Sequence, residues 1–219
     1  MKVSPAERTF WNAQDITTYF EAKPADPRIE TFLEAYTESV GAVTALDLGC
    51  GGGRHSELLA SLGHDTHSID VNPAMLDTTA RRIAANGLSA DIREGSIDAI
   101  PFSDASFDIV VTTGVLHQAN NIAEYLTAIA ELSRVMKPGA YVLLNIFTNA
   151  VWDESYTTVS EDGFSVITRE GLPQTLLPRE LFDALMAEHS LVLVEDQGEE
   201  IKQENTGPRA VYRAIFQKQ

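Results

Sequence analysis

Glycines and carboxylates occur at a spacing that suits the binding of a nucleoside. Gly49, Gly51 and Gly53 follow a short apolar run, and Asp47 lies just before them. Glycine is needed where a strand turns tightly into a helix, because no Cβ then obstructs a ligand that approaches the backbone. Asp70 comes 21 residues after Gly49 and ends a second apolar run. A carboxylate there can accept hydrogen bonds from both hydroxyls of a ribose, so the pattern predicts an adenosyl site.

The glycine spacing argues against a ligand that contains a pyrophosphate. In the dinucleotide-binding fingerprint the third glycine comes three positions after the second, and Arg54 occupies that position here. The sequence has G-x-G-x-G instead. A nicotinamide-dependent oxidoreductase is therefore the less favoured alternative.

The elements that must position these residues follow from the hydrophobic pattern. Short apolar runs alternate with amphipathic ones from Ala42 to Phe147, which predicts a doubly wound, mostly parallel sheet of the α/β class. Lys137-Pro138-Gly139 is expected to end the last helix of this part. Two closing strands would pair antiparallel at the sheet edge, so that the last strand is antiparallel in a sheet of seven. The expected strands are 43–48, 64–70, 90–94, 107–112, 141–147, 191–195 and 210–217.

The chain is expected to form a single domain over residues 1–219, because 219 residues that are 44% hydrophobic suffice for one core. Four parts are expected within it. They are an N-terminal helical cap over 1–39, a cofactor-binding core over 42–147, an inserted lid or hairpin over 150–177, and a C-terminal helix with closing strands over 178–219.

Composition restricts the partners. The 32 Asp and Glu outnumber the 16 Lys and Arg, and the resulting net charge of −16 repels nucleic acids and anionic membranes. The sequence has no long apolar run and no signal-peptide pattern at its start, which predicts a cytoplasmic location. Cys50 is the single cysteine, so we expect neither an internal disulfide nor a metal site. We expect a small-molecule substrate and a monomer or homodimer, between which the sequence does not decide.

Several blocks of the sequence resemble class I S-adenosylmethionine-dependent methyltransferases, in the small-molecule branch called methyltransferase type 11 or UbiE-like. The resemblance implies a Rossmann-like methyltransferase fold, S-adenosyl-L-methionine as cofactor with S-adenosyl-L-homocysteine as product, and direct in-line methyl transfer to a small acceptor. The blocks cover about half the chain in the family's order. They are LDLGCGGG at 46–53, DVNPAM at 70–75, IPF at 100–102, SFD at 106–108 and LSRVMKPG at 132–139.

The resemblance also assigns residues to the cofactor. Asp47 would organise the turn and reach the methionine amine, partly through water, while Asp70 would hold the ribose. The family usually has Gly-Asp after the third strand, whereas this chain has Gly95-Ser96, so Asp98 or the backbone would have to bind the adenine amino group. The full expected set is Asp47, Gly49, Cys50, Gly51, Gly53, Asp70, Val71, Met75, Ser96, Ile97, Thr112 and Thr113.

Little side-chain chemistry is required, because a sulfonium methyl is already electrophilic and alignment provides much of the acceleration. His117 is the best-placed candidate for a general base, although a packing or hydrogen-bonding role for this side chain is the more common case. The other four histidines show no grouping and are expected to be ordinary surface or helix residues. Cys50 is expected to serve as a small side chain in the turn and not as a nucleophile.

The acceptor should be recognised by the irregular segments outside the alternating pattern, since lids shape such clefts. For each candidate there, burial in the core is the alternative. A sensor or an inactive partner subunit that binds the cofactor without transferring methyl groups also remains open. The candidate acceptor residues are Trp11, Tyr19, Phe20, Trp152, Tyr156 and Arg169.

Overall fold

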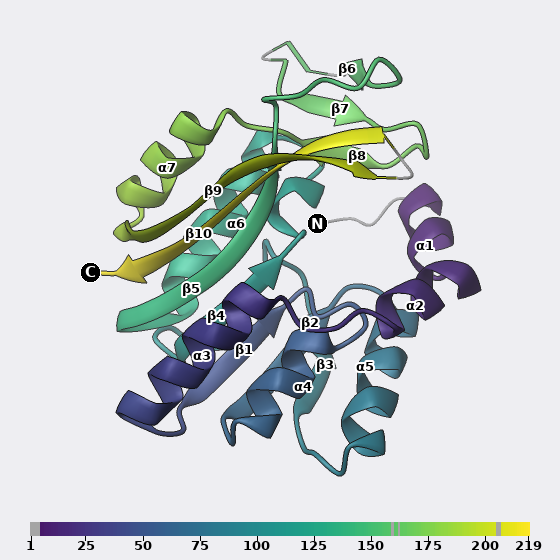
Figure 1. The fold of residues 1–219 in the computed structure, drawn as a ribbon. Helices are drawn as coiled ribbons and strands as arrows, with labels where there is room; N and C mark the ends of the chain where they lie inside the picture. The colour runs from purple at the N-terminus through teal and green to yellow at the C-terminus, as the bar shows by residue number, and fades with distance from the viewer. Residues whose placement is uncertain (1–4, 159, 162, 205–206) are drawn as a thin grey trace.

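A seven-stranded sheet runs through the protein, as seen in a computed structural model that describes residues 5–158, 160–161, 163–204 and 207–219 (Figure 1). The strand order is β3-β2-β1-β4-β5-β10-β9. Strand β10 is antiparallel to both of its neighbours, and the pairs from β3 to β5 are all parallel. The predicted fold class is confirmed. The strands are β1 (Thr44–Leu48), β2 (Asp65–Asp70), β3 (Asp91–Glu94), β4 (Phe107–Thr113), β5 (Met136–Thr148), β9 (Leu191–Glu204) and β10 (Gly207–Lys218).

Helices cover both faces of the sheet. On one face, α3 (Pro27–Val40) and α4 (Arg54–Ser61) pack on an apolar layer that includes Ala45, Val111, Leu143 and Ile215. On the other face, α6 (Ile122–Val135) and α7 (Arg179–Glu188) pack on a larger layer that includes Leu46. Because strand residues alternate between faces, neighbours in the sequence belong to different layers. Helix α5 (Pro73–Ala85) contacts α4, β2 and β3.

Two strands are longer than the sequence predicted. Strand β5 includes Lys137-Pro138-Gly139, which we expected to be a break, and its ladder with β4 changes register at this point. An irregular ladder tolerates a proline and a glycine. Strand β9 continues through the polar stretch after Glu195. It is the edge strand, where polar side chains can contact water and no apolar side chain is needed.

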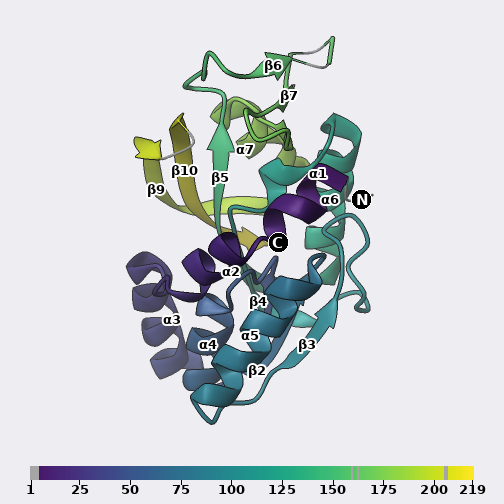
Figure 2. The same cartoon turned by 90° about the vertical axis from the view of Figure 1, so that its right-hand side faces the viewer.

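A second, three-stranded antiparallel sheet follows β5. It consists of β6 (Thr157–Thr158), β7 (Ser165–Ile167) and β8 (Pro173–Thr175). At the other end of the chain, α1 (Pro5–Trp11) and α2 (Gln14–Glu21) run between this small sheet and α5 (Figure 2). The two segments that lie outside the alternating sequence pattern therefore approach the same end of the central strands of the main sheet.

None of the described helices has both the length and the apolar character needed to cross a membrane.

Candidate active site

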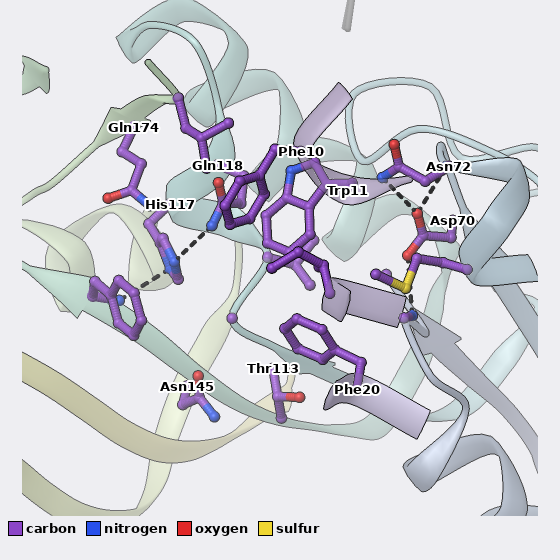
Figure 3. Close-up of a pocket in the computed structure, with 18 of the residues that line it drawn as sticks. Phe10, Trp11, Phe20, Asp70, Asn72, Thr113, His117, Gln118, Asn145 and Gln174 are labelled. Carbon is purple, nitrogen blue, oxygen red and sulfur yellow. Dashed lines mark hydrogen bonds between the residues drawn. The ribbon is translucent and has the colours of Figure 1, made fainter. Parts of the chain in front are cut away.

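A cavity of about 600 Å³ lies at the carboxyl ends of β1, β2, β4 and β5, where a doubly wound sheet usually binds its ligand. Helices α1 and α2, the turn between β7 and β8, and one face of β10 form the remaining walls. Its volume is within the range of roughly 300–1,000 Å³ that is usual for small-molecule sites. Figure 3 shows aromatic side chains from α1 and α2 facing polar side chains from the sheet across this space.

The glycine turn forms one end of the cavity. Gly51 has a φ of +53°, in the left-handed region that favours glycine, and its backbone N–H donates to Oδ2 of Asp70 at 3.0 Å. A Cβ added at Gly51 would overlap no atom and would make an ordinary contact with a ring atom of Phe20 at 3.9 Å. A ligand can therefore approach this backbone closely, as a nucleoside site requires.

Gly52 has a different role. A Cβ there would overlap the backbone carbonyl of Phe20 and lie 2.8 Å from the backbone nitrogen of Glu21. The missing side chain allows the end of α2 to pack directly on the turn. Sequence reasoning did not single out Gly52.

Asp70 joins the turn to the start of α5. Its Oδ1 accepts hydrogen bonds from the backbone N–H and the side-chain amide of Asn72, at 2.9 and 3.1 Å. Burial raises its pKa, although hydrogen bonds to Asn72 and Gly51 act in the opposite direction. Three of the carboxylate's roughly four accepting positions are used by the protein. The side chain lines the cavity, so the remaining capacity faces the ligand.

Asp47 does not line the cavity. It points from β1 towards the first turn of α4, where its Oδ2 accepts a hydrogen bond from Ser56 Oγ at 2.6 Å. Ser56 in turn accepts one from Ser68 at 2.9 Å. Burial raises the pKa of Asp47 to about 6. In this position Asp47 stabilises the turn from behind, and its expected contact with the methionine amine, partly through water, stays a prediction.

Seven of the twelve expected cofactor residues line the cavity and five do not. The turn residues Cys50 and Gly53 face α5, where the Cys50 sulfur accepts from Thr79 at 3.4 Å and a Cβ on Gly53 would meet Thr79. Ser96 donates to Asp98, and neither of them lines the cavity, so the expected replacement of the adenine contact by Asp98 is not supported. The seven lining residues are Gly49, Gly51, Asp70, Val71, Met75, Ile97 and Thr113; the other five are Asp47, Cys50, Gly53, Ser96 and Thr112.

His117 lines the cavity, but its geometry contradicts the role of general base. Its Nδ1 accepts a hydrogen bond from the backbone N–H of Phe147 at 3.0 Å, and the two rings stack with centroids 4.0 Å apart. The side chain is fully buried, and desolvation with the nearby charge of Arg209 lowers its pKa to about 3. The lone pair that a base would use is therefore occupied.

The same geometry determines the tautomer of His117. Because Nδ1 accepts, the ring proton lies on Nε2, which is 3.2 Å from the amide of Gln118. The Gln118 atom at this distance is its amide nitrogen. Two N–H groups cannot pair, so a turn of this amide by 180° would let its oxygen accept the ring proton. Both side chains line the cavity (Figure 3).

The candidate acceptor residues divide by segment. Trp11, Tyr19 and Phe20, from the N-terminal helices, line the cavity. Trp152 and Tyr156 do not; they contact each other edge to face at 5.6 Å, and Tyr156 packs in a separate cluster with Val166 and Leu176.

Arg169 is exposed in the turn between β7 and β8 and also lies outside the cavity, although its neighbours Thr168 and Glu170 line it.

Two histidines expected to be ordinary are buried and connect elements. His55 accepts from the backbone N–H of Asp26 at 3.3 Å and lies 3.4 Å from the hydroxyl of Thr113. His64 lies 3.1 Å from the hydroxyl of Thr37 and accepts from the backbone N–H of Val43 at 3.2 Å. Desolvation lowers the pKa of both.

Several cavity residues were missed because they come from segments that carry no motif. The alternation of β10 offered a signal, since Arg209, Val211 and Arg213 share one strand face. The others are distant in sequence and are brought together by strand pairing. The missed residues include Phe10, Arg54, Gln118, Asn145, Phe147, Gln174, Arg209 and Arg213.

Residues 46–144 match the model of a family described as "Methyltransferase domain". Over these residues, which are less than half of the chain, the protein is similar to a class I methyltransferase domain. This confirms the recognition of a family that depends on S-adenosylmethionine. The chain is 30% identical over 121 residues to a ubiquinone biosynthesis O-methyltransferase of Methylococcus capsulatus, a match that covers 55% of this chain and 49% of the relative.

Solved structures share the fold over most of the chain. A methyltransferase of Methanosarcina mazei superposes with a TM-score of 0.75 at 22% identity, covering 90% of this chain and 99% of that one. A 1,6-didemethyltoxoflavin-N1-methyltransferase of Burkholderia thailandensis, with its substrate and S-adenosylhomocysteine bound, gives 0.65 at 15% identity, with coverages of 100% and 92%. At these identities the likeness establishes the fold of the methyltransferase domain. The chain spans about half or less of the length of the curated relatives it matches.

Proposed function

We propose that this protein binds S-adenosylmethionine and transfers its methyl group directly to a small acceptor. One observation carries the proposal. A single cavity joins the glycine turn and Asp70 to a polar and aromatic compartment formed by His117, Gln118 and Asn145. Cofactor and acceptor can therefore meet in one space, which α1 and α2 help to line.

The residues present suit the cofactor. The open backbone at Gly51 gives room for close approach, and Asp70 offers a buried charged acceptor to a ribose diol. The lining side chains Val71, Met75 and Ile97 provide an apolar surface for adenine. When bound, S-adenosylmethionine supplies an electrophilic methyl group. The protein then needs to align the acceptor and to exclude water.

The state of His117 narrows the acceptor chemistry. Its Nδ1 accepts from the backbone N–H of Phe147, which leaves the ring proton of the neutral side chain on Nε2, so this ring does not remove a proton from the acceptor. The arrangement favours an acceptor that enters with a lone pair ready to attack, such as an ionised oxygen or sulfur or a neutral amine.

A combined binding and transfer assay tests the proposal. Calorimetry should give tighter binding of S-adenosylhomocysteine than of NAD, and incubation of the protein with methyl-labelled S-adenosylmethionine and a metabolite extract should give a labelled product. Asp70→Asn should weaken S-adenosylhomocysteine binding by about 1–3 kcal/mol, because a charged acceptor is lost. Asp65→Asn is the matched control, since Asp65 is exposed at the other end of the same strand.

The outcomes distinguish three functions. Binding with no labelled product would indicate a sensor or an inactive subunit. Tighter binding of NAD would overturn the proposal in favour of an oxidoreductase. Equal effects of the two substitutions would refute the ribose assignment of Asp70.

A further inference from the structure

We propose that the acceptor is a small carboxylic acid and that Arg213 of β10 binds its carboxylate. This inference rests on the proposed function and adds the chemical class of the acceptor. The position, the charge balance and the hydrogen bonding of the β10 wall support it.

A polar row crosses the floor of the cavity. Thr113 on β4 pairs with Asn145 on β5, which pairs with Arg213 on β10, and all three line the cavity. Two residues further into the sheet, the same faces carry Val111, Leu143 and Ile215, which belong to the apolar layer under α3 and α4. The change from apolar to polar side chains at the cavity marks a surface built for a polar ligand.

Burial of arginine in this row is unusual for the chain. Arg209 and Arg213 lie on the same face of β10 and are each 5% exposed, although the protein has twice as many acidic as basic residues. A buried guanidinium is costly unless it is paired. Arg209 is paired with Asp153 at 3.3 Å and lies over the ring of Tyr156. Its interactions fix it as part of the wall.

The buried charge of Arg213 is less well neutralised than that of Arg209. Its main partner is Glu200, at 2.6 Å, whose side chain is 46% exposed. Glu200 also pairs with Lys202 at 3.3 Å and with Arg28 at 4.0 Å. Asp26 is the second carboxylate of this group, at 3.9 Å from Arg213 and 3.8 Å from Arg28. Three cations thus share two carboxylates, which leaves an excess of positive charge beside the cavity.

The Arg213 guanidinium also has an unused hydrogen-bond donor. Nε of Arg213 is buried and has no hydrogen-bond partner among the residues that the structure describes. Asp26 is near enough for charge attraction but too far for a hydrogen bond. A planar guanidinium binds a carboxylate with matching geometry, so an acid group of the ligand would satisfy Nε and the excess charge together.

The opposite wall supports the same class and orients the ligand. Glu7, Asp15 and Glu170 line the cavity from α1, α2 and the β7–β8 turn, so the carboxylates of that side disfavour an acid group there. Gln174 is also buried, and its Oε1 has no partner within the described chain. An amide in this position can pair with a hydroxyl or amino group on the ligand. A hydroxy acid or an amino acid fits both walls.

Acids and their amides provide the test. The protein saturated with S-adenosylhomocysteine is titrated with benzoate, salicylate and anthranilate, each compared with its uncharged primary amide. At least one acid should bind about tenfold or more tightly than its amide, the effect of a hydrogen bond to a charged group. Arg213→Gln should abolish this preference. Arg28→Gln should keep it, because Arg28 pairs with the same two carboxylates but does not line the cavity.

Any other result contradicts either this proposal or the proposed function. If no acid binds, if acids and amides bind equally, or if Arg213→Gln keeps the preference, the proposal is wrong. If Arg213→Gln weakens the binding of S-adenosylhomocysteine instead, Arg213 holds the cofactor's own carboxylate and the proposal is also wrong. Failure of the wild-type protein to bind S-adenosylhomocysteine would refute the proposed function itself, which the calorimetric titration detects before any acid is added.

Discussion

Asp47 gives a quantitative prediction about the electrostatics of the glycine turn. It is 2% exposed, and burial raises its pKa from 3.8 to about 6. The folded protein therefore binds this proton more tightly than the unfolded chain. A group of this kind costs no stability below about pH 4, and its cost grows until the pH passes about 6. The difference of about two pKa units corresponds to about 3 kcal/mol at neutral pH.

The substitution Asp47→Asn isolates this contribution, since asparagine has the same shape and cannot ionise. The free energy of unfolding of the variant, minus that of the wild type, should increase by about 1.5 kcal/mol between pH 5 and pH 7.5. Other titrating groups, including Asp70, contribute to both proteins and cancel in the difference. Urea denaturation at several pH values measures it.

A control tests the cause. Ser56 donates to the ionised carboxylate and lowers its pKa, so Ser56→Ala should raise that pKa further and steepen the loss of stability with rising pH. A difference between Asp47→Asn and wild type that stays constant from pH 5 to pH 7.5 would refute the assignment of the raised pKa to Asp47.

Three further predictions test the walls of the cavity. Of the chain's two tryptophans, Trp11 lines the cavity and Trp152 does not, so a fluorescence change on binding S-adenosylhomocysteine should disappear in Trp11→Phe and persist in Trp152→Phe; the reverse would place the ligand elsewhere. Gly52→Ala should displace α2 and lower both the urea midpoint and the affinity for S-adenosylhomocysteine, with a cost of about 1–3 kcal/mol from overpacking, and unchanged values would contradict the close contact with Phe20. Nitrogen-15 spectra should show His117 as the neutral Nε2–H tautomer from pH 5 to pH 8, because its pKa is about 3; a titration midpoint near 6.5 would restore it as a candidate base.

The sequence alone predicted the parts of the site that are local in the chain. Gly51 and Asp70 each lie at the end of an apolar run, and parallel pairing of adjacent strands brings the two ends together. The relation between motif and geometry is direct here, because each strand end and the following turn are contiguous in the sequence.

The resemblance did not indicate which face of the sheet a strand side chain would occupy. Asp47 precedes the turn, but alternation along β1 places it on the same face as Ala45, under α4, and not towards the cavity. Gly52 escaped notice because its role depends on α2, whose position is set by tertiary packing.

The aromatic residues illustrate a second limit. Trp11 and Trp152 both lie in irregular segments and are chemically equivalent as candidates, yet one lines the cavity and the other is exposed. Their positions depend on how each segment packs against the main sheet, and no local spacing encodes this.

The direction of β10 explains why the proposed acceptor side is built from residues outside the part that matches the methyltransferase family. Because β10 runs antiparallel to β5, its first residues lie at the carboxyl end of β5, where Arg213 pairs with Asn145 and Val211 with Phe147. A parallel strand in this place would present its last residues there instead. The proposed cofactor side lies largely within residues 46–144, whereas Arg213 and Gln174 come later in the chain. Chains that share the methyltransferase domain can therefore share a cofactor and differ in acceptor, since the domain match does not include this wall.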